Sequence, residues 1–131
     1  MMEGVALSTY RLYGTIKDNG IETKGTIVMN EGGAKSRLWR QIYTNVFGYP
    51  TAMLKNRTGA PYGNAILAGV STGNLKDFSI AKEWAEYIDY MEPDLKIHKM
   101  YMDIYEVYNS IYFHLQDDFS NLARLNETYF I

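Results

Sequence analysis

Apolar residues recur at helical spacing over the first 18 residues of the chain. Val5, Leu12 and Ile16 are seven and four positions apart, which places them on one face of an α-helix. The pair Asn19-Gly20 that follows is a usual stop signal at a helix C-terminus. The pattern therefore predicts a first helix that ends before Asn19.

A short strand and a glycine turn are predicted next. Residues 26–29 are apolar and β-branched, which favours an extended strand. Residues 31–36 contain the adjacent pair Gly32 and Gly33. Glycine reaches positive φ without steric cost and lets a ligand approach the backbone closely. We interpret residues 31–36 as a turn that bends through positive φ at these two glycines.

The turn leads into a helix, and a second strand follows. Leu38, Ile42 and Val46 recur every four residues, which predicts a helix over residues 38–46. Residues 51–54 then form a short strand candidate. Because a helix joins the two strands, we expect them to pair in parallel through a right-handed crossover.

The second half of the chain is predicted to be helical. Residues 60–70 are rich in small side chains and predict a closely packed helix, which a loop at 71–74 ends. Residues 79–90 carry apolar positions at helical spacing and predict an amphipathic helix. A longer helix is predicted over residues 95–122, because its apolar residues form an almost unbroken helical stripe: Ile97, Tyr101, Ile104, Tyr108, Ile111, Leu115, Phe119 and Leu122.

Length and composition indicate one small domain over residues 1–131, and the predicted strand–helix–strand unit makes it an α/β domain. The 131 residues are 47% hydrophobic and 21% charged, with a net charge of -2, and the basic residues are scattered along the chain. This disfavours nucleic acid as a partner. The sequence has no apolar run of membrane-spanning length and no signal peptide, so we expect no membrane association and a cytoplasmic location.

The usual metal and catalytic residues are sparse. The chain has no cysteine, which excludes disulfides and thiolate metal sites. Its two histidines, His98 and His114, are too far apart for a metal pair on one helical turn, and both are expected on a mostly polar flank. We therefore predict no metal site and no catalytic residue.

The glycine turn is the candidate for nucleotide contact. The helix after it offers free N–H groups and a partial positive charge, which favour an anion such as phosphate. A strand–turn–helix with two glycines also occurs in many proteins that bind nothing, so both interpretations stay open. The tyrosine-rich helix is interpreted as half-buried packing, because tyrosine buries its ring and keeps its hydroxyl wet. Trp39 and Trp84 are interpreted as packing residues in the same way.

Three segments, taken together in this order, resemble one family. They are Glu-Gly-Gly-Ala-Lys-Ser-Arg-Leu-Trp-Arg-Gln-Ile at 31–42, Gly-Ala-Pro-Tyr-Gly-Asn-Ala-Ile-Leu-Ala-Gly-Val-Ser-Thr-Gly at 59–73, and Met-Glu-Pro-Asp at 91–94. The stretch from residue 2 to about residue 125 is similar to the C-terminal part of an FGGY carbohydrate kinase, and within that family it resembles the xylulokinases. The resemblance implies a mostly helical part of an actin-like ATPase (ribonuclease H-like) domain, with a short parallel sheet and a long C-terminal helix.

The resemblance also implies the binding residues. Gly32 and Gly33 match the glycines that lie against the nucleotide in the family, and Lys35 and Ser36 match its Lys-Ser pair. Arg37 occupies the position on the adenosine side. ATP or ADP with Mg²⁺ is the implied cofactor, and binding by the isolated chain is expected to be weak or absent. A carboxylate at Glu31 departs from the glycine that most xylulokinases carry, and beside a triphosphate it requires a cation.

Parts of the family pattern have no match here. The resemblance covers only the last quarter of such a kinase, so the sugar-binding domain, the catalytic aspartate and both phosphate loops are expected to be absent. One interpretation is a nucleotide-side segment that is inactive alone and needs a partner chain carrying the missing kinase domains. The alternative is a non-catalytic remnant that acts as a self-associating structural or interaction domain. Open sheet edges would favour a homo-oligomer in that case.

Overall fold

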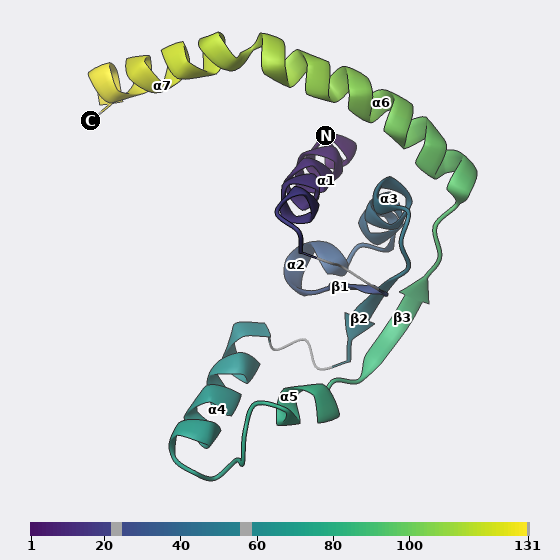
Figure 1. Ribbon diagram of the computed structural model, residues 1–131, viewed down its shortest axis with the longest axis vertical. Helices are drawn as coiled ribbons and strands as arrows, with labels where there is room; N and C mark the ends of the chain where they lie inside the picture. The colour runs from purple at the N-terminus through teal and green to yellow at the C-terminus, as the bar shows by residue number, and fades with distance from the viewer. Residues whose placement is uncertain (22–24, 56–58, 131) are drawn as a thin grey trace.

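The computed structural model describes residues 1–21, 25–55 and 59–130, and most of these residues are helical (Figure 1). The elements in chain order are α1 (Met2–Asp18), β1 (Ile27–Met29), α2 (Glu31–Ala34), α3 (Arg37–Phe47), β2 (Thr51–Leu54), α4 (Gly59–Ser71), α5 (Ile80–Glu83), β3 (Tyr87–Met91), α6 (Leu95–His114) and α7 (Gln116–Phe130).

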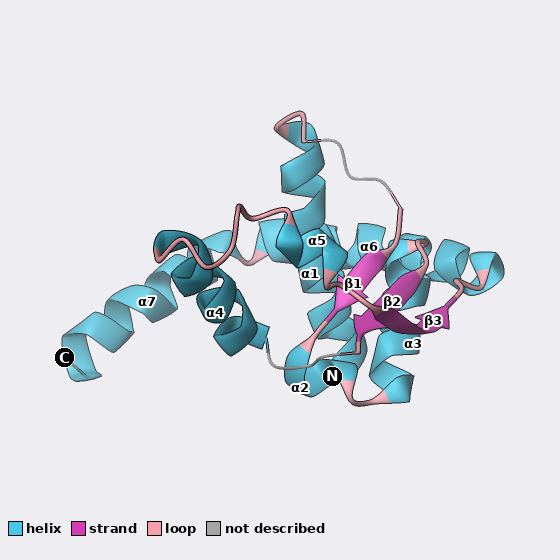
Figure 2. Ribbon diagram, turned by 90° about the horizontal axis from the view of Figure 1, so that it is seen from below, coloured by secondary structure: helices cyan, strands magenta, loops and turns pink. Residues whose placement is uncertain are grey.

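The sheet has three strands in the order β1-β2-β3 (Figure 2). β1 pairs with β2 in parallel, with Ile27 opposite Thr51, and α3 lies in the connection between them. This confirms the predicted strand–helix–strand unit. β3 is antiparallel to β2, with an irregular register between Thr51 and Met53. The sheet is therefore mixed: its short parallel pair was predicted, whereas the antiparallel third strand was not.

The predicted helix over residues 79–90 was wrong for most of its length. Only Ile80–Glu83 is helical, and Tyr87–Met91 forms β3. Apolar residues three and four positions apart, such as Trp84, Tyr87 and Ile88, fit a helix face in a short window. Pairing with the edge of β2 decides the conformation instead, because it satisfies the backbone groups of this segment through a long-range ladder.

The predicted long C-terminal helix is two helices. α6 ends at His114; the C-cap residue Leu115, with φ of −95° and ψ of 6°, leaves the helical region, and α7 begins at Gln116. Asp117 and Asp118 occupy the first turn of α7, where negative side chains interact favourably with the helix dipole. The apolar stripe continues across the bend, so hydrophobic spacing alone did not show it.

The core lies where α1, α3 and α6 meet. Its buried residues are Ala6, Leu7, Val46, Phe47 and Tyr101. Phenylalanine and tyrosine rings surround it at edge-to-face distances typical of aromatic packing. The Tyr10 ring lies 5.4 Å from Phe47 and 5.0 Å from Tyr105.

The tyrosines of α6 pack as predicted. Tyr101 is buried, and its hydroxyl donates to Glu3 Oε1 at 3.2 Å. Further along α6, the Arg11 guanidinium stacks 3.4 Å from the centre of the Tyr112 ring, which adds a cation–π contact between α1 and α6. These contacts fix α6 across α1 (Figure 1).

His98 is part of the interior packing, which corrects its predicted place on a polar flank. Its Nδ1–H donates to the Asn45 carbonyl at 2.9 Å. Its ring covers Gly48, where an added Cβ would come within 2.8 Å of the imidazole. Gly48 also ends α3 in the left-handed conformation, with φ of 68°. Both observations require glycine at this position.

No helix in the described part of the chain is long and apolar enough to cross a membrane. The expectation of a single domain over residues 1–131 stays a prediction.

Replacing Gly48 by alanine should destabilise the fold by about 2 kcal/mol or more, because alanine is strained at positive φ and its methyl group meets His98. Gly63→Ala is the matched control: Gly63 lies in α4 with no atom within 4 Å of an added Cβ. The control should leave stability unchanged or raise it by up to about 1 kcal/mol. Urea denaturation measures the free energy of unfolding of both variants. An equal change in the two variants would contradict this account of Gly48.

Stability should fall at alkaline pH through two tyrosines. Burial raises the pKa of Tyr10, and burial with the Glu3 hydrogen bond raises the pKa of Tyr101. Below about pH 10 both phenols are protonated in the folded and in the unfolded state. Above about pH 10 the unfolded chain releases these protons first, because its tyrosines have the lower pKa. The free energy of unfolding therefore decreases as the pH rises. Urea denaturation from about pH 8 to pH 11 should show a smaller loss for the double variant Tyr10→Phe/Tyr101→Phe. If the double variant loses as much stability as the parent chain over this pH range, the two tyrosines are not the origin of the alkaline loss.

Candidate functional site

The predicted glycine turn is a short helix. Gly32 and Gly33 lie inside α2, and neither has positive φ. Lys35 N–H donates to the Gly32 carbonyl at 3.3 Å, and Ser36 N–H donates to the Gly33 carbonyl at 3.1 Å. These bonds close a tight right-handed turn, which needs negative φ. The prediction of a positive-φ bend was therefore wrong, although the chain does turn here between β1 and α3.

The two glycines have different surroundings. A Cβ on Gly33 would lie 3.1 Å from Trp39 Cζ3, so the indole ring would have to move by a few tenths of an ångström to admit a side chain here. Gly32 is exposed, and an added Cβ there would meet no atom within 4 Å. One glycine is thus covered by Trp39, and the other presents bare backbone to the solvent.

The polar residues after the glycines start α3. Ser36 is the N-cap residue, and its Oγ accepts from the Trp39 N–H at 3.3 Å. This hydroxyl therefore caps the helix, which stabilises its first turn. Lys35 and Arg37 on either side are exposed. The structure thus places Gly32, Lys35 and Arg37 on the surface at the start of α3, whereas Gly33 and Ser36 have structural partners.

A mostly apolar cavity of about 440 Å³ lies on the inner side of this turn. Helices α1 and α3, strand β1 and the Gly33–Ala34 backbone form its wall. The lining residues are Thr9, Leu12, Tyr13, Ile16, Ile27, Val28, Met29, Asn30, Gly33, Ala34, Trp39, Tyr43 and Phe47. Of the five predicted binding residues, only Gly33 lines it. An apolar wall suits an aromatic or aliphatic group, whereas a phosphate would have to lie on the outer side, near Lys35 and Arg37.

The cavity was not predicted from the sequence. The spacing of Leu12 and Ile16 indicates an apolar helix face, but their side chains are 66% and 42% exposed and do not close over the gap. The indole Nε1 of Trp39 is also buried without a partner among the described residues. Neither fact follows from a local pattern, because both depend on where α1 lies relative to α3.

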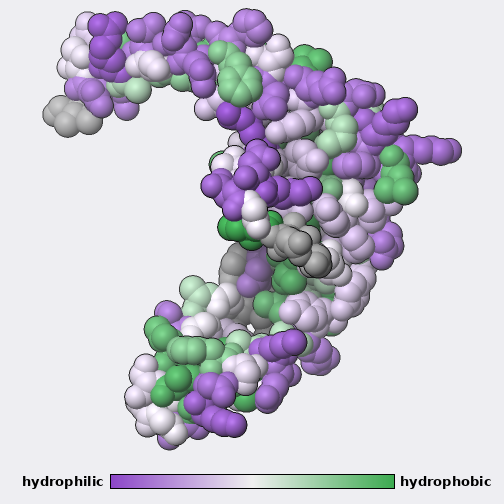
Figure 3. Space-filling view, in the orientation of Figure 1, coloured by the Kyte–Doolittle hydropathy of each residue, from purple (hydrophilic) through white to green (hydrophobic). Residues whose placement is uncertain are grey.

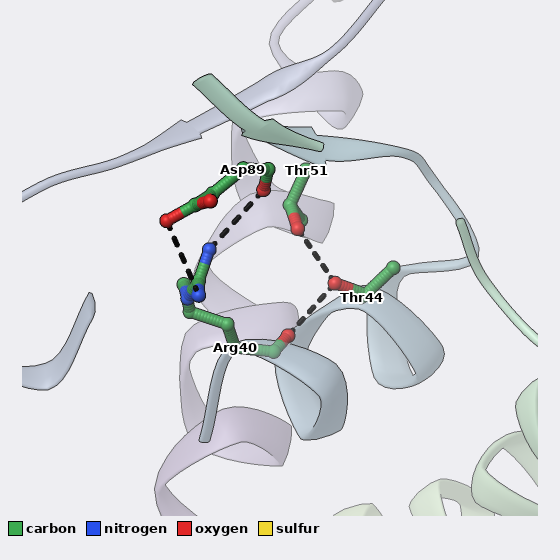
Figure 4. A network of polar contacts seen from close by, with 4 residues as sticks. All are labelled: Arg40, Thr44, Thr51 and Asp89. Carbon is green, nitrogen blue, oxygen red and sulfur yellow. Dashed lines mark hydrogen bonds and ion pairs between the residues drawn. The ribbon is translucent and has the colours of Figure 1, made fainter. Parts of the chain in front are cut away.

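Buried polar contacts hold α3 on the sheet (Figure 4). Arg40 is only 7% exposed. Its Nη1 donates to the Asp89 carbonyl at 3.1 Å, and its Nη2 lies 3.7 Å from Asp89 Oδ2. One turn further along α3, the Thr44 hydroxyl donates to the Arg40 carbonyl at 2.7 Å and lies 2.7 Å from the hydroxyl of Thr51. The helix is therefore joined to both β2 and β3.

The backbone of Asp89 adapts to this contact. Among the described non-glycine residues, only Asp89 has positive φ, at 53°. It lies in β3 next to the irregular register with β2, where the strand departs from regular pairing. This conformation turns the Asp89 carbonyl toward Arg40. No sequence signal pointed to Arg40 or Asp89, since a single basic residue on a helix usually lies in solvent.

The C-terminal half of α3 fixes the segment that leads into α6. Asn45 Oδ1 accepts from the Asp94 N–H at 3.0 Å, and Gln41 Nε2 donates to the Glu92 carbonyl at 3.2 Å. Asp94 in turn caps α6 by accepting from the N–H groups of Lys96 and Ile97. α3 thus contacts both β2 and β3 and the segment that leads into α6.

No group of three or more histidine, cysteine, aspartate or glutamate side chains in the described ranges could hold a metal ion.

The sequence matches the FGGY family of carbohydrate kinases, C-terminal domain, over residues 1–72. The chain belongs to the FGGY family of carbohydrate kinases. This confirms the resemblance noted from the three sequence segments. Within the family the chain is similar to xylulose kinases: it is 33% identical over 115 residues to xylulose kinase from Staphylococcus epidermidis, covering 86% of this chain and 23% of the relative. Xylulose kinase from Bacillus subtilis is 25% identical, with 89% and 23% of the two chains covered.

Solved FGGY kinase structures share the fold. Ligand-bound xylulose kinase from Lactobacillus acidophilus superposes with a TM-score of 0.81 at 21% identity, covering 92% of this chain and 24% of that one. Gluconate kinase from the same organism gives a TM-score of 0.76 at 23% identity, with 87% and 23% covered. The predicted actin-like ATPase architecture is therefore confirmed, with a mixed sheet in place of the parallel one. This chain spans about a quarter of the length of these relatives.

The Arg40 contact should make a measurable contribution to stability. Arg40→Met removes a charged donor from the Asp89 carbonyl and should cost about 2–3 kcal/mol in urea denaturation. Lys55→Met is the matched control: Lys55 and Glu86 form an ion pair at 2.8 Å, but both side chains are more than half exposed. The control should change stability by about 0.5 kcal/mol or less. Similar small losses for the two variants would show that the buried contact is not important.

Proposed function

We propose that this chain forms the nucleotide-facing side of the C-terminal domain in an ATP-dependent, xylulose-kinase-like sugar kinase. The family membership and the xylulose kinase relatives support the class of reaction. The observation that carries the proposal is the exposed backbone at Gly32, with no atom within 4 Å of an added Cβ, next to the exposed cations Lys35 and Arg37.

Each residue of the turn has a separate role in this proposal. Gly32 lets the ribose or a phosphate lie directly against the backbone, because a larger residue would occupy that space. Lys35 and Arg37 neutralise phosphate charge, and the guanidinium can form two parallel hydrogen bonds to phosphate oxygens. Gly33 and Ser36 act indirectly: Gly33 admits Trp39, and Ser36 caps α3. The Glu31 side chain lies outside what the structure describes.

Mg²⁺ would arrive with the nucleotide in this proposal. The ion usually bridges phosphate oxygens and keeps several waters, and it would add positive charge at the phosphates. The described residues offer it no ligand cluster, which is consistent with a metal held by the nucleotide and by other parts of a kinase.

We expect no sugar phosphorylation by the 131-residue chain alone. Phosphoryl transfer needs the γ-phosphate, Mg²⁺ and an activated hydroxyl held in line, and positioning supplies most of the catalysis. The relatives that catalyse it are about four times as long, since the chain covers 23% of them. The remaining groups would have to come from other polypeptide, in the same or a partner chain.

A second candidate function is a non-catalytic domain that associates with copies of itself. The observation that favours it is a row of exposed apolar side chains along α6. The two functions concern different elements, the start of α3 in the first case and α6 in the second.

Calorimetric titration with ADP and ATP, with and without Mg²⁺, tests nucleotide binding. Gly32→Ala should keep the fold, because its Cβ has free space, but should abolish or strongly weaken binding by occupying the place of the ligand. Arg37→Ala should weaken binding about tenfold, as expected for the loss of one charged contact. Lys82→Ala, an exposed change on α5, is the matched control and should bind like the parent chain.

Two results would contradict the proposal. Absence of heat at millimolar nucleotide, with a folded protein, would remove nucleotide contact from this surface. Unchanged affinity in Gly32→Ala would place the ligand elsewhere. Separately, ATP-dependent phosphorylation of xylulose by the purified chain would overturn the expectation that it is inactive alone.

A further inference from the structure

The end of α1 carries a reactive pair of residues, Asn19 and Gly20. Of the nine asparagines in the sequence, only Asn19 is directly followed by glycine. The backbone nitrogen of the residue after an asparagine can attack the side-chain amide, which forms a cyclic imide and releases ammonia. A side chain on that next residue hinders the approach, and glycine has none. By its sequence, Asn19 is therefore the asparagine most open to this deamidation.

The folded chain holds the pair in a regular helix ending. Gly20 is in the left-handed conformation, with φ of 77°, and its N–H donates to the Lys17 carbonyl at 2.9 Å. The N–H of Ile21 donates to the Ile16 carbonyl at 3.3 Å. Two such bonds around a left-handed glycine form a Schellman motif, which satisfies the last carbonyls of the helix. The Gly20 nitrogen is thus bound to the preceding turn of α1.

Both reacting groups of the pair are engaged in this helix ending. The side-chain Nδ2 of Asn19 donates to the Thr15 carbonyl at 2.8 Å. For the reaction, the Gly20 nitrogen must lose its proton and leave the Lys17 carbonyl, and the amide of Asn19 must turn away from Thr15. The imide therefore cannot form while the last turn of α1 is closed.

The last turn of α1 has little to keep it closed. Residues 15–21 are all exposed, and the surface at this end of α1, next to the grey residues in Figure 3, is mostly hydrophilic. Segments that bury little apolar surface and whose backbone hydrogen bonds are exposed open locally at a small cost in free energy. The buried residues of α1 are Ala6 and Leu7, near its other end. Opening of the last turn therefore leaves the core intact.

We propose that Asn19 is a site of spontaneous modification, whose side-chain amide is converted to a carboxylate when the last turn of α1 opens. In the first step, the Gly20 nitrogen bonds to Asn19 Cγ and the bond from Cγ to Nδ2 breaks. Nδ2 leaves as ammonia, with the proton of the Gly20 N–H. In the second step, water opens the imide at Cγ to give aspartate, or at the backbone carbonyl to give isoaspartate. Water is the only co-reactant, and nucleotide binding has no part in the proposal.

The product of the reaction favours the open helix end. A carboxylate at this position cannot donate to the Thr15 carbonyl. It also adds negative charge beside Asp18, at the end of the helix where the dipole is negative. Isoaspartate lengthens the backbone by one carbon, which moves Gly20 out of the Schellman motif. Because Ile16 lines the apolar cavity beside α1, the modification should loosen one wall of that cavity.

Timed incubation at mildly alkaline pH, followed by peptide mapping with mass spectrometry, tests the site. Asn19 should be converted before the other asparagines. Gly20→Ala should slow its conversion about tenfold, because a Cβ hinders the attacking nitrogen, although alanine is strained at this φ and favours the open turn. Gly63→Ala, the same change in α4, is the matched control and should leave the rate unchanged. Earlier conversion of another asparagine, or a parent-like rate in Gly20→Ala, would overturn the proposal.

Amide hydrogen exchange tests the control by the helix end. The rate of conversion in the urea-unfolded chain, divided by the rate in the folded chain, should match the protection of the Gly20 amide against exchange within about threefold, since both reactions need the same opening. Conversion that is as fast in the folded chain as in the unfolded chain would overturn this part of the proposal.

A charge variant tests the effect of the product. Asn19→Asp should lower the protection of the Gly20 amide by about 2- to 5-fold, because it removes the donor to Thr15 and opposes the helix dipole. Asn121→Asp, the same change at an exposed position of α7, is the matched control and should leave this protection unchanged. Equal protection in the two variants would show that the product does not open the helix end.

Discussion

The position of α3 on the sheet depends on polar groups that are buried beneath it. Arg40 reaches Asp89 in β3, and Thr44 reaches Thr51 in β2. A buried donor or acceptor without a partner costs about 1–3 kcal/mol, so rotation of α3 about its axis would break several contacts at once. Apolar packing alone would allow more settings, because hydrophobic burial has no preferred direction. The polar contacts therefore select one orientation of the helix.

That orientation has consequences at both ends of α3. At its N-terminus it places Gly32 and Arg37 on the surface and turns Trp39 inward over Gly33. At its C-terminus it brings Asn45 to Asp94 and to His98, which sets the direction in which α6 leaves the sheet. The candidate nucleotide surface at the start of α3 and the direction of α6 are therefore both set by the same helix.

The sequence predicted those parts of the fold that local pattern determines. α1, α3 and the parallel pair β1–β2 follow from hydrophobic spacing and from a short crossover that allows few arrangements. β3 could not be predicted in this way, because Tyr87 and Ile88 suit a helix face as well as a strand, and long-range pairing with β2 decides between them. At the candidate site, the glycines were found but their conformation was not: the contact between Gly33 and Trp39 depends on how α3 turns back over α2. Arg40 carried no local signal at all, since only the neighbouring β3 makes it a buried residue.

The contact between Gly33 and Trp39 also bears on how this family can diverge. The indole fills the volume that a side chain at residue 33 would need, with 3.1 Å between its Cζ3 and an added Cβ. A side chain at residue 33 would require the indole of Trp39 to move by a few tenths of an ångström or more, so substitutions at positions 33 and 39 are expected to be coupled. Gly32 is under no such steric restriction from within the fold. A preference for glycine at residue 32 among homologues would therefore point to something that packs against this backbone from outside the described residues.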